Sequence, residues 1–164
     1  MIDPSRSRVW IDARSNVHPI HSSASGLEGF IEFDTDRAGE VGAHPTGSLS
    51  FPVRSLSSGN PLERRELQKR IDARRHPTID GVLTSMEPLD DNRLRVRGDL
   101  TFRGVTQGVE GELTLSSLDE RTIQLEGAST FNIRDFGMEP PRVLMLRVEP
   151  EVKVRVELVA ERQV

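Results

Sequence analysis

The sequence predicts an all-β fold, with eight antiparallel strands and one short helix. Two observations lead to this prediction: apolar and polar residues alternate with period two along most of the chain, and helical periodicity is nearly absent. The length of 164 residues suits one domain, residues 1–164, with a substantial buried core. A sandwich and a closed barrel both fit eight such strands. The long alternation favours the barrel, because closure removes exposed strand edges.

The strands are recognised by their alternation. The clearest run is LRVRGDLTFRG at 94–104, where every second residue from Leu94 to Gly104 is apolar or glycine and the others are polar. A strand with one face in water has this pattern. The other predicted strands lie at 8–12, 28–34, 47–53, 79–86, 109–115, 123–133 and 144–158. Pro150 cannot donate a ladder hydrogen bond, so a bulge or a break is expected there.

The single helix is predicted at 61–74. Asn60 is a good N-cap residue, Pro61 suits the first helical position, and Glu63 is placed as the acid of a capping box. The helix is expected to end at Arg75-His76-Pro77, because the residue before a proline disfavours helical geometry. Such a helix would lie over one end of the barrel.

Composition excludes several classes of protein. The chain has 26 acidic and 22 basic residues and a formal charge of -4, which argues against nucleic acid as a partner. Without cysteine there is no disulfide, thiol catalysis or iron–sulfur cluster. The apolar runs are too short for an integral membrane segment. The N-terminus has no apolar stretch of a secretory signal, so we expect a cytoplasmic protein.

Several segments together resemble the YceI-like family. They are LTFRGVTQ at 100–107, IRDFGM at 133–138, W-x-D-x-x-S-x-V at 10–17 and the pair Gly29-Phe30, in the order and spacing of that family. The resemblance implies an extended lipocalin-like barrel with a small helix. It also implies a long apolar channel that binds amphiphilic isoprenoid or fatty-acyl molecules. Family members are often exported.

The inward face of such a barrel is either a filled core or the wall of a cavity. The aromatic content of 4%, without tyrosine, and small inward residues at Gly98, Gly104, Gly111, Gly127 and Ser129 favour a cavity. The predicted ligand-binding residues are Phe30, Phe33, Leu49, Phe51, Val53, Leu67, Leu100, Phe102, Phe131, Ile133, Phe136 and Met138, with Arg134 and His21 as candidates for a polar headgroup.

The polar candidates also define a rival hypothesis. His18 and His21 are three apart, so a strand places them on opposite faces, and we expect no metal site or cofactor. The preferred function is binding and transport of an amphiphilic lipid or isoprenoid without catalysis. The alternative is a barrel enzyme of the cyclase or isomerase kind, with His18, His21 or the pair Arg134–Asp135 as acid and base. A stress-response protein without a tight ligand is a third possibility.

Two interactions are also expected to be possible. A homodimer could form through a strand edge or the barrel mouth. The basic segment RRELQKRIDARR, within residues 64–75, is mainly a solvated face that could touch an anionic membrane.

Overall fold

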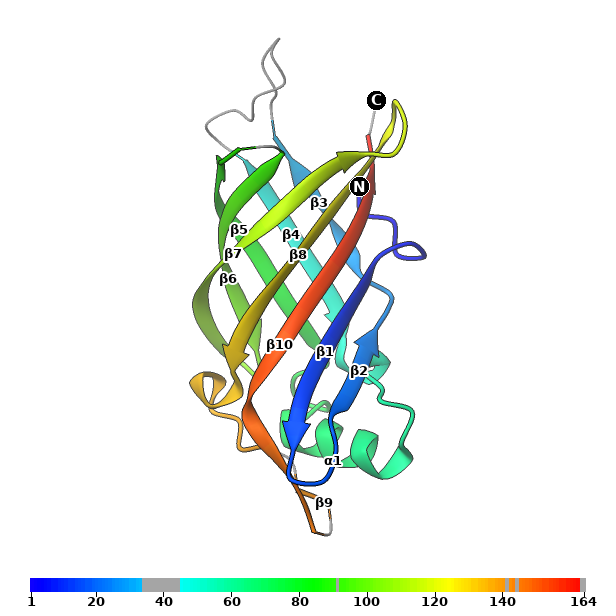
Figure 1. Ribbon diagram of the computed structural model, residues 1–164, viewed down its shortest axis with the longest axis vertical. Coiled ribbons are helices and arrows are strands. Elements are labelled where there is room, and N and C mark those ends of the chain that lie inside the picture. Colours follow the sequence, from blue (N-terminus) through cyan, green and yellow to red (C-terminus); the bar gives the residue numbers. More distant parts are fainter. Residues whose placement is uncertain (34–44, 91, 141, 144, 163–164) are drawn as a thin grey trace.

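The computed structural model describes residues 1–33, 45–90, 92–140, 142–143 and 145–162, and it confirms the all-β prediction (Figure 1). Nine strands rather than eight form one curled antiparallel sheet in the order β2-β1-β10-β8-β7-β6-β5-β4-β3, and β9 pairs with β10. The strands are β1 (Arg8–Ser15), β2 (Ile20–Ala24), β3 (Glu28–Glu32), β4 (Thr46–Pro52), β5 (Thr78–Pro88), β6 (Arg93–Phe102), β7 (Val105–Ser117), β8 (Thr122–Asn132), β9 (Arg142–Val143) and β10 (Leu146–Glu161). The helices are α1 (Pro61–Ile71) and two short 3-10 helices, η1 (Val53–Ser55) and η2 (Ile133–Phe136).

The strand that the sequence reading missed is β2. Its sequence, IHSSA, is mostly polar and lacks the alternation that marked the others. It pairs antiparallel with β1, from Val9 opposite Ala24 to Ala13 opposite Ile20, and lies at one end of the strand order. Its inward face carries Ile20, Ser22 and Ala24, of which only Ile20 is a large apolar residue.

Pro150 produces a bulge and not a break. β10 runs continuously from Leu146 to Glu161. Its register with β1 shifts between Ala13, opposite Val152, and Ser15, opposite Val148, so β10 has extra residues where Pro150 lies. Residues 34 and 144, the outer ends of two predicted strands, lie outside the described residues.

The two outermost strands, β2 and β3, are tied to the rest of the barrel by other segments. The amide of Ile2 donates to the carbonyl of Gly29 on β3 at 3.0 Å, and Ile2 also bridges Ala160 on β10. Near the other end, Ser23 on β2 and Ser57 exchange backbone hydrogen bonds of 3.0 and 3.1 Å. Backbone hydrogen bonds therefore tie both edge strands of the curled sheet to other parts of the barrel, one near each end.

α1 begins as predicted and ends earlier. The Oδ1 atom of Asn60 accepts from the amides of Leu62 at 3.0 Å and Glu63 at 3.4 Å. The helix stops at Ile71 instead of residue 74, because Asp72 adopts the left-handed conformation with φ of 59° and acts as the C-cap. Aspartate tolerates this conformation better than most residues, so the chain turns before His76-Pro77 is reached.

Replacing Asn60 by alanine is expected to lower the free energy of unfolding by about 1 kcal/mol, because two amides of the first turn lose their acceptor. Urea denaturation followed by circular dichroism measures the loss. Asn60→Asp keeps an oxygen at the same place and should retain stability. Equal destabilisation by both substitutions would show that the cap contributes nothing specific.

The buried core is one hydrophobic cluster, and most of its buried side chains lie toward either end of the barrel. The zone at the α1 end contains Phe51, Val53, Leu56, Ile71, Ile79, Phe136 and Met138, all less than 9% exposed. The zone at the end with the β7–β8 turn contains Ile2, Val9, Met86, Leu94, Leu125 and Leu158, each 9% exposed or less. The middle of the barrel is packed differently, and this difference creates the candidate site.

Candidate functional site

Apolar side chains in the middle of the barrel point inward yet are only partly buried. Six of them are Leu49, Leu83, Val96, Leu100, Val154 and Val156. They surround a cavity of about 420 Å³, within the usual range for small-molecule sites. Its wall is apolar almost throughout.

Glycines at inward positions make the room for this cavity. Gly81, Gly98, Gly111 and Gly127 lie on the consecutive strands β5, β6, β7 and β8, and all line the wall. A Cβ atom at Gly98 or Gly127 would lie 2.6 or 2.5 Å from a backbone carbonyl oxygen of the neighbouring strand. A Cβ atom at Gly111 would meet only the Cβ of Ser129, at 3.9 Å. Gly111 therefore borders open cavity space.

Ten of the predicted binding residues lie along the cavity wall. They are Phe30, Leu49, Phe51, Leu67, Leu100, Phe102, Phe131, Ile133, Phe136 and Met138. Four others lie elsewhere. Val53 is fully buried in the core beside the cavity, Phe33 follows β3, and the side chains of His21 and Arg134 are exposed.

Phe30 borders the cavity with its strand but not with an inward side chain. Its neighbour Ile31 lies opposite Gly47 and packs against the core, so alternation turns Phe30 outward, opposite Ser48. The Phe30 side chain is accordingly 40% exposed. The sequence predicted an inward side chain for Phe30, but the Phe30 side chain lies on the outer face of β3.

Gly104 also differs from expectation, because it does not continue the inward stripe of β6. Arg103 and Gly104 form the tight turn between β6 and β7, with φ of 56° and 75°. A Cβ atom at Gly104 would lie 2.7 Å from Cε1 of His76, so glycine suits the positive φ of this turn and leaves the His76 ring in place.

The two segments that carry the strongest resemblance contact each other at the α1 end of the barrel. The rings of Phe102 and Phe136 pack edge to face, with centroids 5.7 Å apart. Gln107 donates through Nε2 to the carbonyl of Asp135 at 3.0 Å, and an Arg103 nitrogen donates to the carbonyl of Gly137. Together LTFRGVTQ and IRDFGM anchor η2 to the β6–β7 hairpin, and both motifs also supply side chains to the cavity wall.

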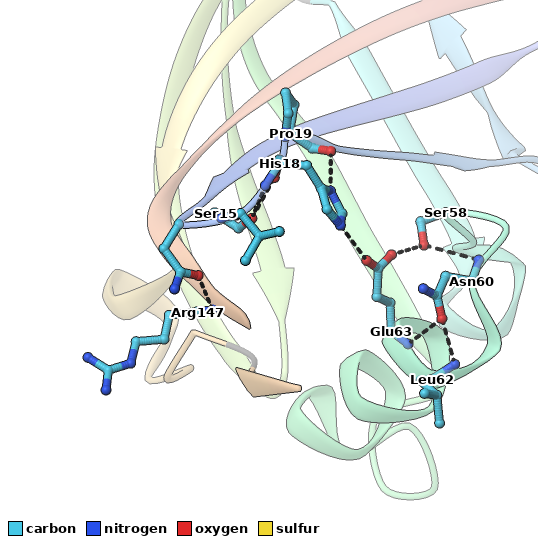
Figure 2. Close-up of polar contacts among 10 residues, drawn as sticks. Ser15, His18, Pro19, Ser58, Asn60, Leu62, Glu63 and Arg147 are labelled. Carbon is cyan, nitrogen blue, oxygen red and sulfur yellow. Dashed lines mark hydrogen bonds and ion pairs between the residues drawn. The ribbon is translucent and has the colours of Figure 1, made fainter. Parts of the chain in front are cut away.

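A polar cluster lies where the cavity wall reaches α1 (Figure 2). Glu63 is on the cavity wall, and its side chain is 12% exposed. Its Oε2 atom accepts from Oγ of Ser58 at 2.5 Å, and its Oε1 atom lies 3.8 Å from Nε2 of His18. His18 comes from the β1–β2 turn, so the cluster joins that turn to the helix. Sequence reasoning gave Glu63 only a capping role.

The charged wall residues on β6 and β7 belong to the outer surface. On β6 and β7, Nε of Arg97 donates to Glu110 at 2.8 Å, and both side chains are about half exposed. That hydrogen bond raises the pKa of Arg97 above its ordinary value. Because successive side chains of a strand point to opposite faces, these residues border the cavity only with their backbone atoms.

The candidate acid and base residues do not converge on the cavity. His21 is 73% exposed, with Nδ1 2.6 Å from Oδ1 of Asp12 on the outside of the β1–β2 pair. Arg134 does not pair with Asp135; its Nε lies 3.7 Å from Glu139. Within the described ranges, no three histidine, aspartate or glutamate side chains gather as a metal site would need.

An antiparallel barrel-like sheet, capped by a helix and enclosing an apolar cavity, defines a lipocalin-like class of protein. The YceI-like domain matches residues 1–160, and the chain belongs to the YceI-like family. This confirms the resemblance found in the sequence.

Solved structures share the fold. BcnA of Burkholderia cenocepacia aligns with a TM-score of 0.84 and 19% identity, over 98% of this chain and 99% of that one. A polyisoprenoid-binding domain from Saccharophagus degradans, implicated in plant cell wall breakdown, gives 0.76 and 14%, over 99% and 97%. A Campylobacter jejuni YceI protein gives 0.72 and 15%, over 87% and 85%.

No curated protein matches this chain. In the part of the chain that the structure describes, no helix is long and apolar enough to cross a membrane.

Proposed function

We propose that the protein binds one amphiphilic isoprenoid or fatty-acyl molecule in the barrel cavity and carries or sequesters it unchanged. The observation that carries this proposal is the ring of inward, half-buried apolar side chains around about 420 Å³. In a filled core these side chains would be fully buried, as Leu125 and Met138 are.

The walls favour hydrocarbon over water. The cavity wall is almost wholly apolar, so it offers few hydrogen bonds to water molecules. Transfer of a hydrocarbon chain from water gains about 0.8 kcal/mol per buried methylene group. A chain with ten buried carbons would gain roughly 8 kcal/mol before the loss of its own freedom is subtracted.

The structural relatives support this ligand class. One of the solved structures with this fold is described as a polyisoprenoid-binding domain. A linear prenyl or acyl chain suits an apolar wall that includes residues from both ends of the barrel, from Leu125 and Leu158 to Phe136 and Met138.

The polar cluster at α1 gives the ligand an orientation. Glu63 and Ser58 lie at the cavity end next to the helix, whereas the inward side chains of the strands that form the rest of the wall are almost all apolar. The polar end of an amphiphile would lie beside these two side chains, with its chain directed toward the β7–β8 end.

Binding without catalysis is part of the proposal. His21, Arg134 and Asp135, the acid–base candidates of the rival enzyme hypothesis, have exposed side chains directed away from the cavity. His18 reaches only the rim of the cavity, through Glu63.

Native mass spectrometry of gently purified protein tests the proposal. We expect a stoichiometric mass increment that organic extraction identifies as a prenyl or acyl chain, or uptake of added farnesol or palmitate at one molecule per chain. The same spectra report whether the chain forms a homodimer. Recovery of a chemically altered probe would support the enzyme instead, and no uptake of either probe would contradict both.

A further inference from the structure

Three large apolar side chains are exposed at the α1 end of the barrel, each on a different element. Val17 in the β1–β2 turn is 63% exposed, Leu62 in the first turn of α1 is 56% exposed, and Met145 between β9 and β10 is 84% exposed. Figure 1 shows α1, β9 and the β1–β2 turn together at this end. We call Val17, Leu62 and Met145 the apolar tip.

The apolar tip is held by hydrogen bonds between two of its elements. Asn16, next to Val17, donates through Nδ2 to the carbonyl of Met145 at 3.0 Å. The amide of Arg147 donates to Oδ1 of Asn16 at 2.6 Å, and the amide of Asn16 donates to the carbonyl of Arg147 at 3.1 Å. Glu63, next to Leu62, lies 3.8 Å from His18, next to Val17, so Leu62 belongs to the same end of the barrel.

Positive charge surrounds the apolar tip. Residues 61–76 contain six arginine and lysine residues and three acidic ones, a net charge of +3 in a chain with -4 overall. Arg65 and Lys69 are exposed and follow Leu62 at spacings of three and seven, so they share one face of α1.

Further arginines extend this basic surface toward β9. A surface hollow at this end is bordered by Arg70, Arg134, Arg142 and Arg147, with Glu139 and Glu149 among them. Arg134 and Arg70 have acidic neighbours, Glu139 and Glu66, at 3.7 and 2.9 Å. For Arg65, Lys69, Arg142 and Arg147, all in the described ranges, the structure shows no ion pair.

We propose that the α1 end of the barrel docks on the surface of an anionic lipid bilayer. The apolar tip enters the region of the headgroups and upper acyl chains, and the surrounding arginine and lysine side chains contact lipid phosphates. The three exposed apolar side chains of the tip would stay in water beside a nucleic-acid backbone and would gain no binding free energy there. A bilayer would remove them from water. The polar cavity end, with Glu63, lies on this side of the molecule.

Vesicle co-sedimentation of the full chain tests the proposal directly. We expect binding to vesicles of equal parts phosphatidylcholine and phosphatidylglycerol, at least tenfold weaker binding to pure phosphatidylcholine, and weakening by salt. The double substitution Arg65→Glu/Lys69→Glu and the single substitution Met145→Ser should each reduce the partition coefficient several-fold. Retained uptake of farnesol by these variants shows that they are folded and separates docking from cavity binding.

Matched controls come from the opposite end of the barrel. Leu118, 47% exposed, and Arg121 lie in the β7–β8 turn. Leu118→Ser and Arg121→Glu should leave vesicle binding unchanged. Equal effects at both ends would overturn the proposal. So would an absence of binding to anionic vesicles, or binding to single-stranded DNA in its place.

Discussion

Gly111→Leu is expected to weaken binding of a prenyl or acyl probe by at least tenfold, a change of about 1.4 kcal/mol in binding free energy. Residue 111 lies on the cavity wall in the middle of β7, and a Cβ atom there would meet only Ser129, at 3.9 Å. A leucine side chain would extend into the space that the hydrocarbon would occupy. Fluorescent fatty-acid titration, with farnesol as competitor, measures the affinity.

The matched control is Gly108→Leu on the same strand. A Cβ atom at residue 108 has no atom within 4 Å, and alternation places it on the outer face of β7. The control should bind the probe like the unaltered protein. Equal affinity of the Gly111→Leu protein would show that the ligand does not use this cavity.

Phe136→Ala is expected to lower the free energy of unfolding by about 3–5 kcal/mol, a large part of the stability of a typical domain. Phe136 is 4% exposed and packs against the ring of Phe102. Its removal leaves a void where η2 joins the β6–β7 hairpin. Urea denaturation measures the change.

Phe131→Ala separates packing from binding. Phe131 and Phe136 both line the cavity, but Phe131 is only partly buried. Truncation of Phe131 should therefore destabilise the fold less than Phe136→Ala does and should weaken probe binding more. The reverse ranking would show that Phe131 contributes more to packing than to binding.

The sequence predicted most strands because alternation records one buried and one wet face. It failed where that contrast is weak. β2 has a polar sequence, IHSSA, and β3 is only five residues long, so the inward face was assigned to Phe30 instead of Ile31. The end of α1 depended on one aspartate in a left-handed conformation, which neighbouring residues do not reveal.

The cavity could be predicted only in part. Small residues on inward stripes indicated open space, and Gly98, Gly111 and Gly127 do line it. The polar cluster could not be predicted, because Glu63 and His18 are 45 positions apart in sequence and meet only when the β1–β2 turn lies against α1. His21 and Arg134, predicted to contact a headgroup, lie on the outer surface, each beside an acidic side chain.

The contact between LTFRGVTQ and IRDFGM bears on how much a shared motif says about the ligand of a related protein. These motifs form a joint at one barrel end as well as part of the cavity wall. We therefore expect relatives that share them to share this end of the barrel before they share a ligand. Cargo should vary with the wall in the middle of the barrel, at positions such as Gly81, Gly111 and Ser129, where a larger side chain shortens the space available.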